Sequence, residues 1–399
     1  MKVGIYGGTF DPPHLGHIAA ARCAAGALGL DKLVFVPAGI PPHKALPADV
    51  PAPGQRLAMT AIAADQLLMP GVTEVWDEEL RRTGKSYTAD TLRRARERWS
   101  GAELWLLMGS DMFLSLQTWH QPAEVMSMAG ICAFGRTAAD SEDALAPQLE
   151  FLTATYGAKA VTLTVPDLVD ISSTRLRALL PGGEGAEYLS QAVYGYILRE
   201  KLYGTCADLF RLTDEELRCV SYSMMRAKRI AHVRGTEAEA VRLALRWGAD
   251  AEKARRAAIL HDCTKYYSLE EHLALCSRYG LSLDSLERTA EKLLHAKTGA
   301  LLARHMFGQD DEIYYAIFYH TTGRAGMSLL EKVLYMADYI EPNRDFPEVE
   351  ALRGLAYTDL DRAVAMGALL SIREMEEMGR SVHRNTRDAY DYYQKGTTP

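Results

Sequence analysis

All strand-like segments of this 399-residue chain lie in its first half, and this asymmetry constrains the fold more than any other feature. Six short apolar runs, KVGIYGG, KLVFVPAG, VTEVWD, ELWLLMG, GICAFGR and AVTLTV, alternate with segments of helical composition. Continuous apolar strands separated by helices are typical of a parallel sheet that is covered on both faces. The first half is therefore predicted to be a doubly wound α/β domain.

Only helical patterns follow these strands. The later segments, such as EAEAVRLALRWG and SLLEKVLYMADYI, are amphipathic at helical spacing. Gly248, Gly280 and Gly308 stand where helices are expected to stop, because glycine readily adopts the left-handed conformation that ends a helix. The chain is also longer than one hydrophobic core usually organises. We predict two domains, an α/β domain over residues 1–205 and an all-α domain over residues 206–399.

Charge and cysteine content argue against several classes of protein. The formal net charge of −7 disfavours non-specific nucleic-acid binding, which needs a basic surface. The six cysteines are scattered without CxxC pairs, so we expect free thiols in a reducing cytosol. No apolar run approaches the roughly 18 residues expected of a membrane span. The chain is predicted to be cytoplasmic, with neither nucleic acid nor membrane as a partner.

The motif GGTFDPPHLGH follows the first predicted strand and opens a helix. Gly7 and Gly8 are expected to end that strand, where they let the backbone turn sharply and approach a ligand. His14 and His17 are three residues apart and therefore share one face of the first helical turn. Backbone N–H groups and the helix dipole favour an anion at that place. The motif predicts a phosphate site that carries two imidazoles.

This motif resembles the HxGH signature of the nucleotidyltransferase superfamily, in the form found in nicotinate-nucleotide adenylyltransferases. Further matching segments follow in the family's order, namely VPAGIPPHK, SYTADTL, LLMGSDMFLSLQTWHQ, FGR and ISSTRLR. The resemblance covers the first of the two predicted domains. It implies a Rossmann-like fold and the transfer of an adenylyl group from ATP to nicotinate mononucleotide, which yields deamido-NAD and pyrophosphate.

The resemblance also assigns an ATP site. Adenylyl transfer gathers negative charge on the α-phosphate and the leaving pyrophosphate, so catalysis depends on positioning and charge stabilisation. The two imidazoles can donate hydrogen bonds to phosphoryl oxygens. Ser172 is expected to cap a second helix, with Ser173, Thr174 and Arg175 in its first turn as a cradle for the β- and γ-phosphates. Magnesium is expected to bridge these phosphates.

The remaining contacts of the nucleotidyl site follow from the resemblance alone. It implies binding by a set of residues spread over the family's motifs: Thr9, Phe10, Lys44, Thr88, Asp111 and Trp119. Lys44 would meet a phosphate or carboxylate, Asp111 a ribose, and Trp119 offers a flat face to a pyridine ring. The alternative is another adenylyl- or cytidylyltransferase, such as one acting on phosphopantetheine. The segments SYTADTL and TWH disfavour it.

A second constellation lies in the helical half. Its members stand in successive apolar helical stretches, with one histidine directly followed by an aspartate: His232, His261, Asp262, His295, His320 and Asp338. Burying His261 beside Asp262 costs several kcal/mol unless something neutralises them, and a metal ion does so. Mixed imidazole and carboxylate ligands suit iron, manganese or similar transition metals. Six ligands exceed what one ion normally takes from protein, so we predict two ions with Asp262 as the bridge.

The order of these residues resembles the HD-domain phosphohydrolases, whereas His272, His305 and His383 are interpreted as ordinary structural histidines. The segments LLHAKTGALLA, YHTTGRAGMSLLEKVLYMADYIEPNR and FPEVEALRGLA are similar to the YqeK-type HD family. Members of that family cleave diadenosine tetraphosphate symmetrically to two ADP. By this resemblance Lys265 and Arg324 would assist phosphate binding. The segment RIAHVRGTEAEA departs from the family, in which a smaller and more apolar step is usual.

The sequence thus predicts a bifunctional enzyme whose small-molecule partners are ATP, nicotinate mononucleotide and diadenosine tetraphosphate. One alternative for the second half is a noncatalytic metal- or nucleotide-binding module that regulates its neighbour or drives dimerisation. The full set of six ligands argues against that alternative. A homodimer is left open.

Overall fold

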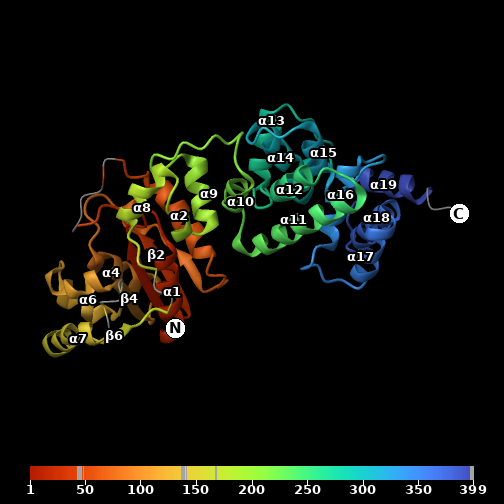
Figure 1. Ribbon diagram of the computed structural model, residues 1–399. Helices are drawn as coiled ribbons and strands as arrows, with labels where there is room; N and C mark the ends of the chain where they lie inside the picture. Colours follow the sequence, from red (N-terminus) through yellow and green to blue (C-terminus); the bar gives the residue numbers. More distant parts are fainter. Residues whose placement is uncertain (43–46, 48, 136–139, 141, 167–168, 396–399) are drawn as a thin grey trace. The chain divides into compact units, whose positions relative to one another are not determined.

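The computed structural model describes residues 1–42, 47, 49–135, 140, 142–166 and 169–395. The chain folds as two compact units, Met1–Cys206 and Ala207–Pro399 (Figure 1). This division lies one residue from the predicted one. No helix in the described part of the chain is long and apolar enough to cross a membrane.

The first unit is built on a six-stranded parallel sheet with the order β3-β2-β1-β4-β5-β6. Its strands are β1 (Lys2–Gly8), β2 (Lys32–Pro37), β3 (Thr73–Val75), β4 (Glu103–Gly109), β5 (Gly130–Phe134) and β6 (Ala160–Leu163). The chain first adds β2 and β3 on one side of β1. It then returns and adds β4, β5 and β6 on the other side of β1. Ligands of such sheets bind beyond the carboxyl ends of the strands at this reversal.

Helices cover both faces of the sheet, which confirms the doubly wound prediction (Figure 1). One face packs against α1 (Leu15–Leu28), α2 (Pro53–Asp65), α8 (Ser173–Leu179) and α9 (Gln191–Glu200). The other packs against α4 (Thr88–Arg98), α5 (Ser110–Leu114), α6 (Pro122–Met128) and α7 (Glu142–Tyr156). Alternate residues of β1 serve the two layers, because Tyr6 lies in the first core and Ile5 in the second. The short elements are α3 (Glu78–Arg81), η1 (Leu116–Thr118), η2 (Leu180–Gly182) and η3 (Ala186–Tyr188).

The second unit is helical, as predicted. It contains α10 (Asp214–Tyr222), α11 (Ala227–Trp247), α12 (Ala251–Leu260), α13 (Leu269–Arg278), η4 (Glu287–Thr289), α14 (Glu291–His305), α15 (Asp311–Tyr319), α16 (Leu329–Ile340), α17 (Val349–Thr358), α18 (Leu360–Glu377) and α19 (Arg384–Gln394). The long helix α11 packs along α12 and α16, and α12 also meets α14 and α15. These five helices therefore surround one interior region.

Helix ends in this unit follow the local chemistry of the sequence. The side chains of Thr213 and Ser268 each accept a hydrogen bond from the backbone N–H three residues further on. The glutamate at that position accepts one in turn from the backbone N–H of the cap residue. Gly248, Gly280 and Gly308 have φ values of 80°, 66° and 62° just beyond α11, α13 and α14. The predicted helix stops are confirmed.

Candidate functional sites

A cavity of about 530 Å³ opens in the first unit at the carboxyl ends of β1 and β4. It brings together every predicted nucleotidyl-site residue that the structure describes: Gly7, Gly8, Thr9, Phe10, His14, His17, Thr88, Asp111, Trp119, Ser172, Ser173, Thr174 and Arg175. Lys44 lies outside the described residues. The cavity is at the reversal of the strand order, where doubly wound folds bind their ligands.

The two histidines of the motif stand side by side at the start of α1. His14 is the N-cap, and its backbone N–H donates to Nδ1 of His17 over 3.1 Å. Nδ1 of His17 therefore carries the lone pair, and in the neutral ring the proton sits on Nε2. The ring centroids are 3.8 Å apart. A Cβ on Gly16 would lie 3.0 Å from Nδ1 of His14, so the glycine between them leaves room for this arrangement.

The structure corrects the role expected of Gly7 and Gly8. Strand β1 does end at Gly8, but neither glycine has a positive φ. The left-handed residue of the loop is Phe10, with φ 47°. A Cβ on Gly8 would press on the Phe10 ring at 3.0 Å, whereas a Cβ on Gly7 would meet nothing within 4 Å. The glycines thus provide space for the loop and for a ligand, and they do not make the turn.

The second predicted phosphate contact lies at the start of α8. Ser172 caps this helix, as expected, by accepting the N–H of Arg175 over 3.2 Å. Oγ of Ser173 donates to the carbonyl of Pro12 over 3.0 Å, and Oγ1 of Thr174 accepts from Arg177 over 3.2 Å. The hydroxyls therefore also hold the motif loop and the helix together. Arg175 is exposed at the cavity.

Buried polar groups that the sequence analysis missed hold the motif loop in place. Asp11 is buried, contacts Arg177 at 3.2 Å and accepts a hydrogen bond from the Tyr203 hydroxyl over 2.8 Å. Arg56 is also buried and donates to the carbonyls of Thr9 and Ala38 over 3.1 and 2.7 Å. Burial lowers the pKa of Arg56. The available signal was Asp11 as the one charged residue in the loop segment GGTFDPP.

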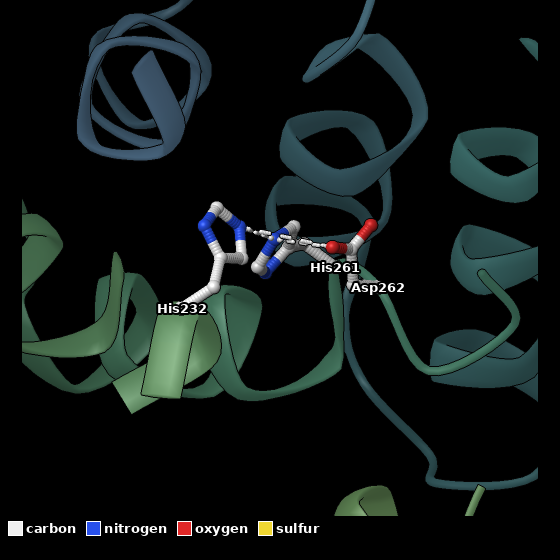
Figure 2. Close-up of side chains that lie close together, drawn as sticks. All are labelled: His232, His261 and Asp262. Atoms are coloured by element: carbon white, nitrogen blue, oxygen red, sulfur yellow. Dashed lines mark hydrogen bonds and ion pairs between the residues drawn. The ribbon is translucent and has the colours of Figure 1, made fainter. Parts of the chain in front are cut away.

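In the second unit, the six predicted metal ligands converge. His232 lies on α11, His295 on α14 and Asp338 on α16. His261 and Asp262 follow α12 directly, and His320 follows α15. Figure 2 shows His232, His261 and Asp262 pointing toward one another. All but Asp338 are classed as buried.

The two oxygens of Asp262 face different histidine pairs. Oδ2 lies 3.7 Å from Nε2 of His232 and 3.4 Å from Nε2 of His261. Oδ1 lies 3.2 Å from Nε2 of His295 and 4.0 Å from Nε2 of His320. We call these the Oδ2 half-site and the Oδ1 half-site. Each holds three donors close enough to share an ion, and Asp262 belongs to both.

Asp338 completes the Oδ2 half-site. Its Oδ1 lies 3.0 Å from Nε2 of His232 and 3.9 Å from Nε2 of His261. Burial would raise the pKa of Asp338, but hydrogen bonding with His232 and the charge of Arg344 hold it well below its usual range. The same balance lowers the pKa of Asp262, whose burial is outweighed by His261, His295 and Lys265. Both carboxylates are therefore ionised.

Ring orientation turns every Nε2 of the cluster into a potential ligand. Nδ1 of His261, His295 and His320 lies 2.6 to 2.7 Å from the carbonyl oxygen three residues earlier. A carbonyl only accepts, so these Nδ1 atoms carry the protons and each Nε2 presents a lone pair. Nδ1 of His232 lies 3.0 Å from Oε1 of Glu341. Burial would lower the pKa of this ring, but hydrogen bonding with Asp338 and Glu341 outweighs burial and raises the pKa, so a metal ion at its Nε2 would displace a proton. A histidine whose other nitrogen is bonded to an oxygen is typical of a metal ligand.

The donor set fits divalent metal ions on grounds internal to the protein. Burial, followed by neighbouring cationic groups, lowers the pKa of both His295 and His320, so these rings are neutral. Their Nε2 lone pairs lie 3.2 Å apart, and Oδ1 of Asp262 beside them is buried without a hydrogen bond. Nζ of Lys265 lies 3.0 Å from Nε2 of His295 and offsets part of the repulsion among these acceptors, and a divalent cation between them would offset the rest.

Glu341 is a partner that the sequence analysis missed, and it explains the departure near His232. A Cβ on Gly235 would fall well inside contact distance of Oε2 of Glu341. The glycine therefore lets the carboxylate reach His232 across α11. The hydroxyl of Thr321 was also missed, and it lies 3.2 Å from Nε2 of His320.

The two predicted phosphate-binding cations differ in position. Nζ of Lys265 lies 3.0 Å from Nε2 of His295 and 3.6 Å from Oδ1 of Asp262, so it belongs to the Oδ1 half-site. Arg324 instead makes two hydrogen bonds of 2.7 and 2.8 Å with the buried carboxylate of Glu331. Its guanidinium is thus engaged away from the ligand cluster.

The histidines interpreted as structural lie outside the cluster. His272 is fully buried and bonded to Thr298 at 2.8 Å, and His305 stacks on Tyr279 at 4.1 Å. His383 lies 3.2 Å from Glu287. Together with Asp284, these two residues form a group whose ligand atoms are close enough to hold a metal ion. Nζ of Lys297 is 2.7 Å from the Glu287 carboxylate and supplies the positive charge there.

Comparison with known proteins matches these two halves separately. Residues 5–179 match the cytidylyltransferase-like family, and residues 229–343 match the HD domain. The chain therefore joins a nucleotidyltransferase domain of the Rossmann-like class to an HD domain.

Individual relatives identify a more specific family for each half of the chain. The chain is 34% identical over 221 residues to a Pelobacter propionicus protein named "Probable nicotinate-nucleotide adenylyltransferase", covering 100% of that protein and 52% of this chain. It is 40% identical over 185 residues to "Bis(5'-nucleosyl)-tetraphosphatase, symmetrical" of Bacillus subtilis, covering 98% of that protein and 46% of this chain. A solved Clostridium acetobutylicum structure, titled a predicted HD superfamily hydrolase involved in NAD metabolism, is 36% identical. It covers 47% of this chain and 99% of its own, with a TM-score of 0.46.

The first half of the chain belongs to the nicotinate-nucleotide adenylyltransferase family. The second half belongs to the family of symmetrical bis(5'-nucleosyl)-tetraphosphatases. Both resemblances identified from the motifs are confirmed.

Proposed function

We propose that the first unit transfers an adenylyl group from ATP to nicotinate mononucleotide. The observation that carries this proposal is the pair of imidazoles at the start of α1, facing the same cavity as Arg175 at the start of α8. With Nδ1 occupied by a backbone N–H, His17 can donate through Nε2 to a phosphoryl oxygen. Arg175 would bind the pyrophosphate that leaves.

The remaining residues of the cavity would position the two substrates. Thr9, Thr88 and Trp119 are proposed to hold the mononucleotide and Asp111 to meet a ribose. All four line the cavity. Lys44 remains a predicted contact. Magnesium, when bound with ATP, would bridge and neutralise the phosphates.

A comparison of acceptor substrates tests this proposal. Purified protein is given ATP with nicotinate mononucleotide, nicotinamide mononucleotide or phosphopantetheine, and pyrophosphate release is measured with each. We expect the nicotinate form to react with the highest kcat/KM. Turnover of phosphopantetheine alone would replace the proposal by its alternative.

We propose that the second unit hydrolyses diadenosine tetraphosphate symmetrically to two ADP with two bound transition-metal ions. The carrying observation is that one ionised carboxylate, Asp262, faces two separate pairs of imidazole lone pairs. Mixed nitrogen and oxygen donors favour iron or manganese. Such ions supply Lewis acidity toward the phosphate under attack and toward the attacking water. The chain holds the ligands, and Lys265 adds positive charge beside the Oδ1 half-site.

Removal of ligands from the cluster tests the metal role. His261→Ala and Asp262→Ala are each expected to abolish bound metal and tetraphosphate cleavage, because both remove donors from the cluster. Adenylyl transfer should be unchanged, because its cavity lies entirely in the first unit. Elemental analysis and chromatography of the products provide the measurements.

His305→Ala is the matched control, since His305 lies outside the cluster. Undiminished hydrolysis in the His261 and Asp262 variants would remove the assignment. Metal binding without hydrolysis in the unmodified protein would favour the noncatalytic regulatory module. A cytoplasmic location is a further prediction, and light scattering of the purified protein determines whether it forms the homodimer that the sequence leaves open.

A further inference from the structure

Two arginines lie against the carboxylates of the Oδ2 half-site. Arg229 donates to Oδ2 of Asp262 through Nε and through a second guanidinium nitrogen. Arg344 donates to Oδ1 of Asp338 over 2.7 Å and to the carbonyl oxygen of Asp338 over 2.8 Å. Neither arginine stands out in the sequence patterns, and both are polar neighbours of the ligands rather than ligands themselves.

The two arginines reach the half-site from different elements. Arg229 is on α11, three residues before His232, whereas Arg344 follows α16. Two hydrogen bonds hold the backbone of Arg344 in place. Its N–H donates to the carbonyl of Glu341 over 2.9 Å, and its carbonyl accepts from the Arg353 side chain over 3.1 Å. The two guanidinium groups are therefore held near the same pair of carboxylates by independent parts of the backbone.

These guanidinium groups retain access to solvent and donors to spare. The side chain of Arg229 is 20% exposed and that of Arg344 is 35% exposed, whereas Asp262 is fully buried. A guanidinium has five N–H donors in a planar fork and remains charged at any physiological pH. Each arginine uses only part of that fork on its carboxylate. The N–H donors that remain suit phosphate oxygens, which guanidinium groups bind in pairs of parallel hydrogen bonds.

We propose that Arg229 and Arg344 are polyphosphate-binding residues, held at the rim of the Oδ2 half-site to bind the phosphate chain of a dinucleoside polyphosphate. The inference rests on the hydrolase activity proposed above. Lys265 performs the equivalent role beside the Oδ1 half-site. The phosphate chain would then have positive charge on both sides of Asp262.

A purely structural role makes the opposite prediction for metal binding. If the arginines only positioned Asp262 and Asp338, their loss would weaken metal binding and would affect substrate only through the metal. If they bind phosphate, their loss removes positive charge from the half-site and leaves its ligands in place. Metal affinity is then retained or increased, while affinity for the polyphosphate falls.

The experiment compares Arg229→Gln and Arg344→Gln with the unmodified protein and with Arg226→Gln. Arg226 is an exposed arginine at the start of the same helix, so it controls for overall charge. Manganese affinity is measured by calorimetry. Binding of a methylene-bridged, non-hydrolysable analogue of diadenosine tetraphosphate is then measured on the manganese-loaded proteins, together with kcat and KM for the hydrolysable compound.

We expect unchanged or tighter manganese binding and a loss of roughly 10- to 100-fold in analogue affinity in each of the two variants, the range typical of a charge-assisted hydrogen bond. Arg229→Lys should recover part of that affinity, because it restores the charge without the fork. KM should rise more than kcat falls, and Arg226→Gln should behave like the unmodified protein.

Two results would overturn the inference. Loss of manganese in Arg229→Gln and Arg344→Gln would make both arginines positioning residues for the ligands. Unchanged analogue affinity in manganese-loaded variants would exclude phosphate contact. Failure of the unmodified protein to bind the analogue or cleave its hydrolysable counterpart would instead overturn the proposed hydrolase and this inference with it, so the two failures are distinguishable.

Discussion

At the scale of single residues, the position of one proton separates the two sites. Nδ1 of His17 accepts a backbone N–H, so Nε2 is left to donate. Nδ1 of His261 instead faces a carbonyl oxygen, so Nε2 is left to accept. The same side chain therefore suits a phosphate in the first unit and a metal ion in the second. The helix terminus beside each ring decides which form is present.

His17→Ala tests the donor role. Removing one preorganised donor from a developing charge typically lowers kcat by about 100- to 1,000-fold. We expect a loss of that size in adenylyl transfer, with normal cleavage of diadenosine tetraphosphate. His120→Ala provides the control, since His120 is exposed and its ring lies tilted against the Tyr87 ring, with the centroids 4.3 Å apart. Equal losses in the two variants would contradict a specific role for His17.

His272 makes the stability of the second unit depend on pH. Burial lowers the pKa of His272 to about 4 from 6.5. Between these values the unfolded chain binds a proton that the folded chain does not, so stability rises with pH across this window and is lost as pH falls toward 4. Urea unfolding at a series of pH values should show a shallower rise in His272→Gln. Parallel curves for the variant and the unmodified protein would exclude this contribution.

At the scale of elements, sequence patterns predicted most of the framework but few of the supporting contacts. Strand and helix periods, caps and terminal glycines are local, so they are legible in the chain itself. Glu341 and Arg56 could not be identified in that way. Each is a buried polar residue whose partners lie on other elements, and its role depends on packing that no local pattern records.

The ligand identities were predictable, but the grouping of the ligands was not. The order of histidines and aspartates indicated a metal cluster because each residue interrupts an apolar helix. Which oxygen of Asp262 faces which histidine follows from the packing of α12 against α11, α14 and α15. Arg324 illustrates the limit of a motif, since its guanidinium is paired with Glu331. Its predicted phosphate contact remains a prediction.

The contact of Glu341 with His232, which depends on the space left by Gly235 of α11, provides a test at this scale. Gly235→Ala places a methyl group inside contact distance of Glu341, so the carboxylate must move away from His232. Loss of such an outer contact typically costs about 10- to 100-fold in metal affinity. Calorimetry with manganese should show this decrease. Gly354→Ala in α17 is the matched control, because its new methyl group meets nothing within 4 Å. Equal metal affinities in the two variants would contradict the role of Gly235.

At the scale of the whole molecule, each site lies within one compact unit. The nucleotidyl cavity lies in Met1–Cys206 and the ligand cluster in Ala207–Pro399. We propose that these units act as separate catalytic domains joined in one chain. The proposed substrates or products of both contain adenosine linked through phosphates. The fusion would therefore join the synthesis of one dinucleotide and the hydrolysis of another in a single chain.

Separating the domains tests this organisation. Residues 1–206 and 207–399, expressed apart, are each expected to retain their own activity because each unit is compact and the described residues of each site lie within one unit. Steady-state assays of the mixture and of the full chain measure any benefit of fusion. Equal rates would exclude a kinetic benefit. Loss of one activity on separation would show that the domain in question depends on its neighbour.

The divided carboxylate of Asp262 also has a thermodynamic consequence. One ionised group serves both half-sites, so the charge it offers to an ion at Oδ2 is no longer fully offered to an ion at Oδ1. Two ions bound as proposed would therefore load in energetically linked rather than independent steps. Reciprocity would then require that each ion change the affinity for the other by the same factor. A binding isotherm for the pair would contain this coupling, which no single dissociation constant can describe.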